Sequence, residues 1–328
     1  MLSELPTEIL LHIFNLLTYK DKLELCYTCK KLYEYLENMP FIEFYKYEKV
    51  QHLPYFKNFK SLIFAGSVDV THIQRICITN NCERISNPKN IKYITSRDFN
   101  RIVDFRLFTK LESLQLFNFN QNIDFPNNLV TLILHDFNRP INVKFPDTLQ
   151  KLGLFSFNQK YEFVFPNNLK ELHLQSFNQE YDFAFPDSIK SLNLQSFNQT
   201  YNFAFPSNLL KLWLEKLDKE YDFPFPNKLT YLNLNDYAQE YNFPFPNLLT
   251  YLNLSNFNKE YVFPFPDTLI HLYLNSFNKK YDFPFPKNLK ILNLEDFNQE
   301  YNFPFPNTLI RLYLNKFNKK YEFEFPNT

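Results

Sequence analysis

Few side chains in this 328-residue chain are spaced for catalysis or metal binding. Cys26 and Cys29 form a Cys-x-x-Cys pair, but no second pair of cysteines or histidines follows at zinc-finger spacing. We therefore interpret the pair as two small apolar side chains on one helix face. The six histidines also lack metal-ligand spacing; they stand at positions 12, 52, 72, 135, 173 and 271. The sequence predicts neither a metal site nor a cofactor.

Acid–base and phosphate chemistry have no better support. The acidic residues recur mostly at fixed polar positions, where each is solvated rather than paired with a second carboxylate. Gly66 and Gly153 are the only glycines, so a glycine-rich loop around a phosphate cannot be built. A carbohydrate-cleaving β-helix would need carboxylates or basic residues clustered on a strand face, and the sequence lacks them. We expect a protein without catalytic activity.

Overall charge also restricts the partners. Lysine plus arginine and aspartate plus glutamate are equal, at 35 each. This balance gives no net field to attract nucleic acid or an anionic membrane, so neither is an expected partner. No apolar run reaches the roughly 18 residues of a membrane-spanning helix, and the first residues lack the basic region of a signal peptide. These features indicate a cytoplasmic protein with reduced thiols, the nucleus being the alternative compartment.

Aromatic side chains recognise partners by contact, and here they are abundant, with 40 Phe, 22 Tyr and one Trp. Most belong to a 20-residue block that repeats from near residue 126 to the end. Proline recurs at every twentieth position from Pro126 to Pro326, and leucines follow in phase, as at Leu169, Leu172 and Leu174. A fixed period of this length is typical of a solenoid in which each unit forms one coil, meaning one turn of the solenoid.

Each unit contains one predicted strand and one predicted turn. Leu172 and Leu174 alternate with polar residues, which is the two-residue period of a strand with one buried face. Asn178 closes the strand, and asparagine holds this position in eight of ten units, the exceptions being Asp218 and Ala238. An asparagine side chain can donate to and accept from backbone groups at a turn. We expect the stacked asparagines to form a ladder along the solenoid.

The rest of each unit is a return arm that leads to the next strand. Aromatic residues alternate there, at Tyr181, Phe183 and Phe185, and later units place a proline between them, as at Pro224. Proline cannot donate to a hydrogen-bond ladder. We therefore expect the return arm to be extended or polyproline II rather than sheet or helix.

The first forty-five residues differ from the repeat. Leu10, Ile13, Phe14 and Leu17 recur at helical spacing, and Thr18 can cap a second helix over residues 20–26. A third helix is predicted over residues 29–38. Three short helices cannot bury this many apolar side chains, and surplus apolar surface on a small module indicates that a partner covers it.

The residues of this segment resemble an F-box. The resemblance rests on Leu5-Pro6-x-Glu8-Ile9-Leu10 and continues through Cys29-Lys30-x-Leu32-Tyr33. It spans residues 2–40 and implies docking on the Skp-type adaptor of a cullin-RING (SCF) ubiquitin ligase. The adaptor-binding residues that it implies are Leu5, Pro6, Ile9 and Ile13. One departure is Met39-Pro40-Phe41, where many F-boxes carry a tryptophan. The alternative is a small helical cap that seals the end of the solenoid.

The repeat resembles the leucine-rich repeat in its Leu-x-x-Leu-x-Leu order followed by asparagine. The form Phe-Asn-x-x-Tyr-x-Phe-x-Phe-Pro is closer to the FNIP repeat, over residues 100–328 and more faintly over 59–99. An F-box followed by FNIP repeats is an architecture known from amoebae and their large DNA viruses, so a viral protein would act in the host cytoplasm.

These resemblances imply an α + β fold in three parts. Residues 1–45 form a three-helix F-box, residues 46–99 a linker with irregular first coils, and residues 100–328 the repeat solenoid. The solenoid is expected to be right-handed and leucine-rich-repeat-like, with 20-residue coils, a parallel concave sheet and an extended or polyproline convex side. A continuous right-handed β-helix is the alternative fold.

Candidate binding residues flank the strand leucines, where they are predicted to face the concave side. One predicted row is Glu171, Ser191, Lys211, Tyr231, Tyr251, His271, Ile291 and Arg311; the other is His173, Asn193, Trp213, Asn233, Asn253, Tyr273, Asn293 and Tyr313. These positions vary while the core positions do not, and Trp, Tyr and Arg are the usual hot-spot residues. The predicted target-binding residues are Glu171, His173, Trp213, Tyr231, Tyr251, His271, Tyr273, Arg311 and Tyr313. Drift among repeats would produce the same variation.

The sequence thus predicts a substrate-recognition subunit of an SCF ubiquitin ligase, whose solenoid binds an unidentified target protein. The alternative is a protein-binding or scaffold solenoid without a ligase link, and a β-helical hydrolase is a third interpretation. A further expectation concerns self-association. Phe317, Tyr321 and Phe323 lie in the last coil, and we expect them to be covered by a second copy or frayed.

Overall fold

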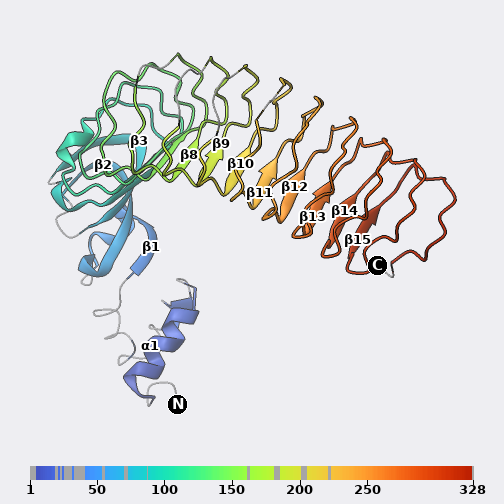
Figure 1. Ribbon diagram of the computed structural model, residues 1–328. Coiled ribbons are helices and arrows are strands. Elements are labelled where there is room, and N and C mark those ends of the chain that lie inside the picture. The colour runs from blue at the N-terminus through green and yellow to red at the C-terminus, as the bar shows by residue number, and fades with distance from the viewer. Residues whose placement is uncertain are drawn as a thin grey trace. The chain divides into compact units, whose positions relative to one another are not determined.

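The computed structural model describes most of the chain (Figure 1). The described residues are 5–18, 21–22, 24–25, 32, 41–53, 56–69, 73–86, 88–160, 163–180, 185–200, 205–220 and 223–326. The chain consists of two compact units. Unit 1 is Met1–Phe119 with Pro126–Leu129, and unit 2 is Asn120–Phe125 with Val130–Thr328.

The first predicted helix is present in unit 1 as α1, Thr7–Leu16. Pro6 precedes it, and the Pro6 carbonyl accepts hydrogen bonds from the backbone N–H groups of Ile9 and Leu10 at 3.1 Å each. Leu10 and Phe14 are fully buried, as their spacing predicts. Most of the other two expected helices, at 20–26 and 29–38, lies outside the described residues. Thr18 does accept a 3.4 Å hydrogen bond at Oγ1 from the Asp21 N–H, which is the expected capping contact.

Unit 1 continues as a parallel sheet with irregular coils. Its strands are β1 Phe41–Lys46, β2 Phe59–Asp69, β3 Arg75–Ser86, β4 Tyr93–Asp98 and β5 Ser113–Leu116. The short helices α4 Tyr47–Val50, η2 Phe56–Asn58, η3 Pro88–Asn90 and η4 Phe105–Leu107 connect them. The paired core residues Leu62, Ile76, Ile94 and Leu114 are spaced by 14, 18 and 20 residues. This variable spacing agrees with the irregular first coils that the sequence predicts, and it explains why the repeat is faint before residue 100.

Parallel pairing reaches back as far as β1, into residues that the sequence assigned to the F-box and its linker. Phe44 pairs with Ser61 and Tyr45 with Leu62. Phe41 stacks on Phe59 with ring centroids 4.5 Å apart, and Val50 of α4 is 2% exposed. The segment expected to be a linker is therefore packed against the first coils of this unit.

Unit 2 is a regular parallel β-solenoid. Its strands are β6 Thr131–Leu134, β7 Lys151–Leu154, β8 Glu171–His173, β9 Ser191–Asn193, β10 Lys211–Trp213, β11 Tyr231–Asn233, β12 Tyr251–Asn253, β13 His271–Tyr273, β14 Ile291–Asn293 and β15 Arg311–Tyr313. Neighbouring strands pair in parallel with an offset of 20 residues, as between Leu232 and Leu252. The described part of each coil contains one strand of three or four residues. One strand per coil supports the leucine-rich-repeat-like prediction over a continuous β-helix.

The core of unit 2 repeats in the same way from coil to coil. The leucine at the second position of each strand from β6 to β14 and the leucine two residues after it are buried, as at Leu292 and Leu294. Behind them the aromatic rings that follow the strands stack from coil to coil, except at Leu217; Phe277 and Phe297 lie 6.2 Å apart and 2° from parallel. Each ring buries its faces against the neighbouring coils, so a single coil cannot bury its own core.

The predicted asparagine ladder is confirmed. The backbone N–H of Asn298 donates to Oδ1 of Asn278 at 2.9 Å, and Asn318 repeats this contact with Asn298 at 3.0 Å. Gln299 adds a second donor, Nε2, at 2.9 Å from Asn278 Oδ1. Asp218 continues the ladder at its own position, because its N–H donates to Asn198 Oδ1 at 2.9 Å. Ala238 has no side-chain acceptor for the next coil.

The return arms of the later coils are held by tyrosine hydroxyls. Tyr261 accepts at its hydroxyl a 3.1 Å hydrogen bond from the Phe245 N–H, which lies one coil earlier. The same contact links Tyr241 to Phe225, Tyr281 to Phe265, Tyr301 to Phe285 and Tyr321 to Phe305. These arms show no strand pairing within the described residues, as their prolines predict. A side chain therefore supplies the contact that a sheet ladder would otherwise make.

Candidate functional site

The outward residues of the strands in unit 2 form two straight rows, which we call the sheet face. Lys211 pairs with Tyr231 and Tyr231 with Tyr251 in the first row. Trp213 pairs with Asn233, which continues the second row. Strand register thus confirms that the two rows predicted from the sequence are rows of neighbours. It leaves their role in binding as a prediction.

Four rings and a histidine of the sheet face contact one another; we call Trp213, Tyr231, Tyr251, His271 and Tyr273 the aromatic cluster. Trp213 lies 4.7 Å from Tyr231, and Tyr231 stacks on Tyr251 at 4.3 Å. Tyr251 also contacts Tyr273 at 5.6 Å and His271 at 6.1 Å. Two of these contacts, Trp213–Tyr231 and Tyr251–Tyr273, cross between the rows, and the other two run along the first row. Together they cover strands β10 to β13. All five residues are half-buried, so ring faces remain accessible beside ordered neighbours.

Polar groups beside the cluster are held by one another. Asn233 donates through Nδ2 to Glu215 at 2.9 Å, and Gln195 donates to the other oxygen of the same carboxylate. Burial, reinforced by Tyr231, raises the pKa of the Tyr251 hydroxyl above its ordinary value. The Tyr251 hydroxyl therefore stays uncharged near neutral pH within a surface made of rings. Such a surface binds by ring contact and hydrogen bonding rather than by proton transfer.

Glu171 and His173 form a separate group on β8. Glu171 makes a 2.7 Å ion pair with Lys151, which holds the pKa of its carboxyl below the usual value. Burial lowers the pKa of His173, and its ring lies 5.9 Å from Phe155, which in turn stacks on His135 at 4.5 Å. Strand β9, with Ser191 and Asn193, separates this group from the aromatic cluster.

Gly153 makes room for the Phe155 ring. A Cβ atom at Gly153 would lie 2.9 Å from Cε2 of Phe155. A larger residue here would force the Phe155 ring to shift, and the sequence offered no sign of this close contact.

Arg311 and Tyr313 lie on β15, and both are exposed. Strand β14 separates them from the cluster. The nine predicted target-binding residues therefore fall into three groups. Five form the aromatic cluster, two lie near the start of unit 2 and two lie on its last strand.

The predicted adaptor-binding residues lie in α1 or directly before it. Ile9 is 49% exposed and Pro6 is exposed, whereas Leu5 and Ile13 are half-buried. Leu16, which sequence analysis did not select, is 75% exposed. The helix thus presents apolar side chains to solvent along with its buried face.

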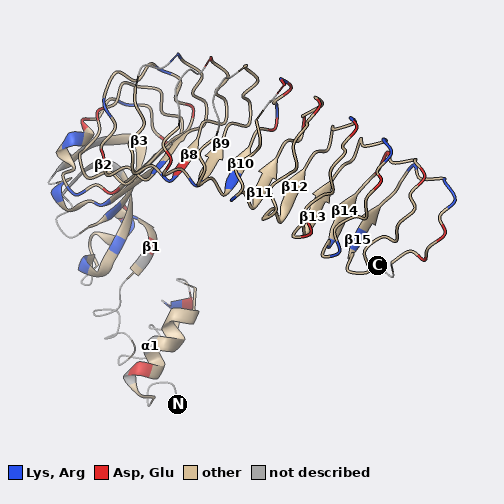
Figure 2. Cartoon of the chain, in the orientation of Figure 1, with Lys and Arg blue, Asp and Glu red and all other residues tan. Residues whose placement is uncertain are grey.

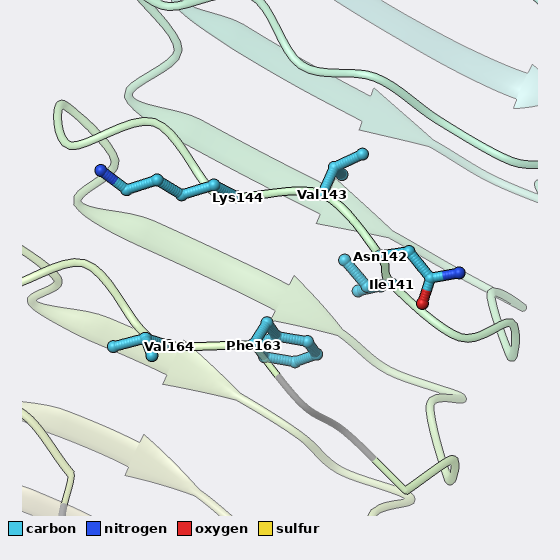
Figure 3. A pocket seen from close by; sticks show the side chains of 6 residues that line it. All are labelled: Ile141, Asn142, Val143, Lys144, Phe163 and Val164. Carbon is cyan, nitrogen blue, oxygen red and sulfur yellow. The ribbon is translucent and has the colours of Figure 1, made fainter.

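Two hollows were missed by sequence analysis. The larger, of about 570 Å³, lies between two return arms of unit 2 (Figure 3). Ile141 and Val143 stand there in place of the usual tyrosine and phenylalanine, and Phe163 and Val164 line the next arm. Smaller side chains in one arm therefore open the space. The second hollow, of about 320 Å³, lies over strands of unit 1.

The described residues contain no group of three or more His, Cys, Asp or Glu side chains that could hold a metal ion. Cys77 and Cys82 are buried, and the Cys26–Cys29 pair lies outside the described residues. Within the same described part of the chain, no helix is long and apolar enough to cross a membrane.

Solved structures with leucine-rich repeats are similar to this chain. YopM of Yersinia pestis, a leucine-rich effector protein, superposes with a TM-score of 0.56 at 15% identity, covering 79% of this chain and 78% of its own. YopM of Yersinia enterocolitica gives a TM-score of 0.51 at 15% identity, covering 77% and 68%. At this identity the likeness concerns the fold alone. The chain is a parallel β-solenoid with leucine-rich-repeat-like neighbours.

Sequence families identify both parts of the chain. The F-box-like family matches residues 2–39, and the FNIP Repeat family matches residues 157–194. The chain therefore contains an F-box-like domain and FNIP repeats.

Two proteins of Acanthamoeba polyphaga mimivirus are similar over short segments. An F-box and FNIP repeat-containing protein is 34% identical over 64 residues, which is 20% of this chain and 22% of the relative. An F-box protein is 32% identical over 63 residues, covering 19% and 47%. The matched segments span less than half of either relative.

Proposed function

We propose that this protein is a non-catalytic substrate receptor of an SCF ubiquitin ligase. Its F-box-like segment docks on the Skp-type adaptor, and its solenoid binds a target protein for ubiquitination by the cullin-bound enzymes. The observation that carries the proposal is the F-box-like match at residues 2–39, joined in one chain to a repeat solenoid.

Exposed apolar side chains support the adaptor contact. Ile9 and Leu16 of α1 are 49% and 75% exposed, and the Leu5-Pro6 pair precedes the helix. Exposed apolar groups on so small a module are stabilised when a partner covers them. Leu5, Pro6, Ile9 and Ile13 are the proposed adaptor-binding residues.

Ring packing on the sheet face supports a target-binding role. Tyr and Trp bury large areas and lose little conformational freedom on binding. Mutual contact has already ordered Trp213, Tyr231 and Tyr251. We therefore place the centre of the target footprint on the aromatic cluster, with Glu171, His173, Arg311 and Tyr313 at its periphery.

A pull-down of the full-length protein with purified Skp-type adaptor tests the ligase link. We expect wild type to retain the adaptor and the double variant Leu5→Asp/Pro6→Ala to lose it. Ile310→Asp is the matched control, because Ile310 is an exposed apolar residue of the solenoid and its replacement should leave adaptor binding unchanged.

Failure of the wild-type protein to bind the adaptor would contradict the receptor proposal. Equal binding by the double variant would contradict the assigned residues. In the first case the alternative function remains, which is that of a protein-binding scaffold whose solenoid works without a ligase.

A further inference from the structure

The outward residues of the strands in unit 1 differ in chemistry from the sheet face of unit 2. Strand register places Phe44, Ser61, Arg75, Tyr93 and Ser113 in one outward row, and Lys46, Ile63, Cys77, Thr95 and Gln115 in the next. Ser61 and Cys77 are buried within these rows. Two of these ten residues, Lys46 and Arg75, are cationic and none is acidic; Figure 2 marks the charged residues of the chain by colour. Arg97 follows two residues after Thr95 on β4 and so faces the same side.

A hollow of about 320 Å³ lies within these rows. Phe44 of β1 and Tyr93 of β4 form apolar walls, while Thr95, Ser113 and Gln115 supply two hydroxyls and an amide. Arg75 of β3 and Ile94 of β4 complete the lining. The hollow thus combines hydrogen-bond donors with one fixed positive charge, and it is large enough for a single side chain of a partner.

Arg75 is held in place without a carboxylate. Its guanidinium lies 5.0 Å from the centre of the Tyr93 ring. The Tyr93 hydroxyl donates to Glu112 at 3.2 Å, and Glu112 is already paired with Lys92 at 2.7 Å. Among the side chains that the structure describes, no acidic group forms an ion pair with Arg75 or Arg97. The guanidinium donors of Arg75 therefore face solvent from an ordered position.

The pKa of the neighbouring Cys77 thiol agrees with this arrangement. Burial raises the pKa of Cys77, and the positive charge of Arg97 opposes that rise. Arg97 therefore acts on the same outward rows as Arg75. Glu43, the nearest acidic residue of β1 in sequence, precedes Phe44 at a register irregularity and does not belong to the paired rows.

We propose that this hollow binds an acidic segment of a partner polypeptide. One aspartate or glutamate carboxylate takes two parallel hydrogen bonds from Arg75, while Thr95, Ser113 and Gln115 bind the adjoining peptide groups. Lys46 and Arg97 attract further acidic residues of the same segment. A single guanidinium in a small hollow suits a carboxylate better than a nucleic-acid backbone, which needs a continuous basic stripe. The inference concerns unit 1 and does not depend on the ligase link.

Fluorescence anisotropy of the full-length protein with a labelled Gly-Ser-Glu-Asp-Glu-Ser-Gly peptide tests the proposal. We expect saturable binding that weakens between 50 and 300 mM salt, and at least tenfold weaker binding of the Gly-Ser-Gln-Asn-Gln-Ser-Gly peptide. Arg75→Met, which keeps an apolar stem over Tyr93, should lower the affinity at least tenfold. Arg75→Lys should bind more weakly than wild type because lysine lacks the planar fork.

Arg106→Ala is the matched control, because Arg106 is an exposed arginine of unit 1 that pairs with Asp104 at 2.8 Å. It should bind the acidic peptide as wild type does. Gln115→Leu gives a second variant of the hollow that does not alter charge, and it should weaken binding severalfold. Equal binding of the two peptides, or wild-type affinity in both Arg75→Met and Gln115→Leu, would overturn the proposal. Tighter binding of a single-stranded oligonucleotide than of the acidic peptide would also overturn it.

Discussion

The Tyr301 hydroxyl accepts a 2.9 Å hydrogen bond from the backbone N–H of Phe285, one coil earlier in the chain. The same hydroxyl donates to the Phe283 carbonyl at 3.3 Å. One side chain thus satisfies both a donor and an acceptor of a proline-containing arm that does not pair as a sheet. Because Tyr301 is 2% exposed, water cannot readily replace either contact.

Replacing Tyr301 by Phe should destabilise the solenoid. Ring packing is kept, but the buried Phe285 N–H loses its acceptor, which costs about 1–3 kcal/mol of the free energy of unfolding. Urea denaturation followed by circular dichroism measures the change. Tyr313→Phe is the control, since Tyr313 is 39% exposed and its variant should stay within about 0.5 kcal/mol of wild type. Equal stabilities for the two variants would contradict the assigned role of the hydroxyl.

Stability should also fall at alkaline pH. Burial raises the pKa of the hydroxyls of Tyr241, Tyr261, Tyr281 and Tyr301. Their contribution is complete below the pKa of an unfolded tyrosine, about 10, because both states are then protonated. Above it the unfolded chain releases protons that the folded chain keeps. The free energy of unfolding therefore falls by about 1.4 kcal/mol per pH unit for each tyrosine.

Urea denaturation at pH 8, 10 and 11 measures this dependence. Tyr301→Phe should show a shallower fall than wild type because it has one fewer such group. An unfolding free energy that stays constant or increases between pH 10 and 11 would contradict the prediction.

Removing one asparagine should interrupt the ladder. Asn278 Oδ1 accepts from the Asn298 N–H and from Gln299 Nε2, each at 2.9 Å. Asn278→Ala leaves both donors without this acceptor and should cost about 1–2 kcal/mol of unfolding free energy. Chemical denaturation again provides the measurement, and a loss below about 0.5 kcal/mol would show that water replaces the ladder.

The converse change should stabilise the protein. Ala238 occupies a ladder position without an acceptor, so Ala238→Asn should provide one for the backbone of the next coil. We expect a gain of about 0.5–1.5 kcal/mol, measured as a higher urea midpoint at unchanged slope. Ala238→Ser is the comparison, because its shorter side chain should reproduce little of the gain.

Target capture should depend on the aromatic cluster. Trp213→Ala combined with Tyr231→Ala removes the 4.7 Å ring contact and most of the exposed ring area, so affinity for the target should fall at least tenfold. Quantitative pull-down compares the proteins retained by this variant, by wild type and by Tyr313→Ala. Adaptor binding should be equal in all three. An unchanged set of captured proteins in the double variant would contradict the assigned footprint.

Much of unit 2 was predictable because its signals are local and repeat. Leu172 and Leu174 have strand spacing by themselves, and Asn178 supplies a turn acceptor in whichever coil it stands. Repetition at 20 residues then dictates that equivalent residues become neighbours. The strands, the ladder, the return arms without sheet and the two outward rows all followed from these features.

Unit 1 shows where this reasoning stops. The paired residues Leu62, Ile76 and Ile94 are unequally spaced, so the sequence shows a faint repeat there but no fixed period that would give the register between its coils. Arg75 and Tyr93 are eighteen residues apart and carry no motif, yet register sets them side by side. The hollow that they line could be found only from the tertiary structure.

Side-chain contacts between coils could not be predicted from the sequence either. The rows containing Trp213, Tyr231 and Tyr251 were predictable, but the ring contacts among these residues depend on rotamers and on the distance between strands. The periodic tyrosines were visible in sequence, whereas the bond from the Tyr301 hydroxyl to the Phe285 backbone required the position of the preceding arm. Hydrophobic period and turn chemistry are properties of each short segment, so they can be recognised in the sequence alone. Hydrogen bonds and ring contacts between coils depend on how segments are superimposed in space, and only the folded solenoid decides that.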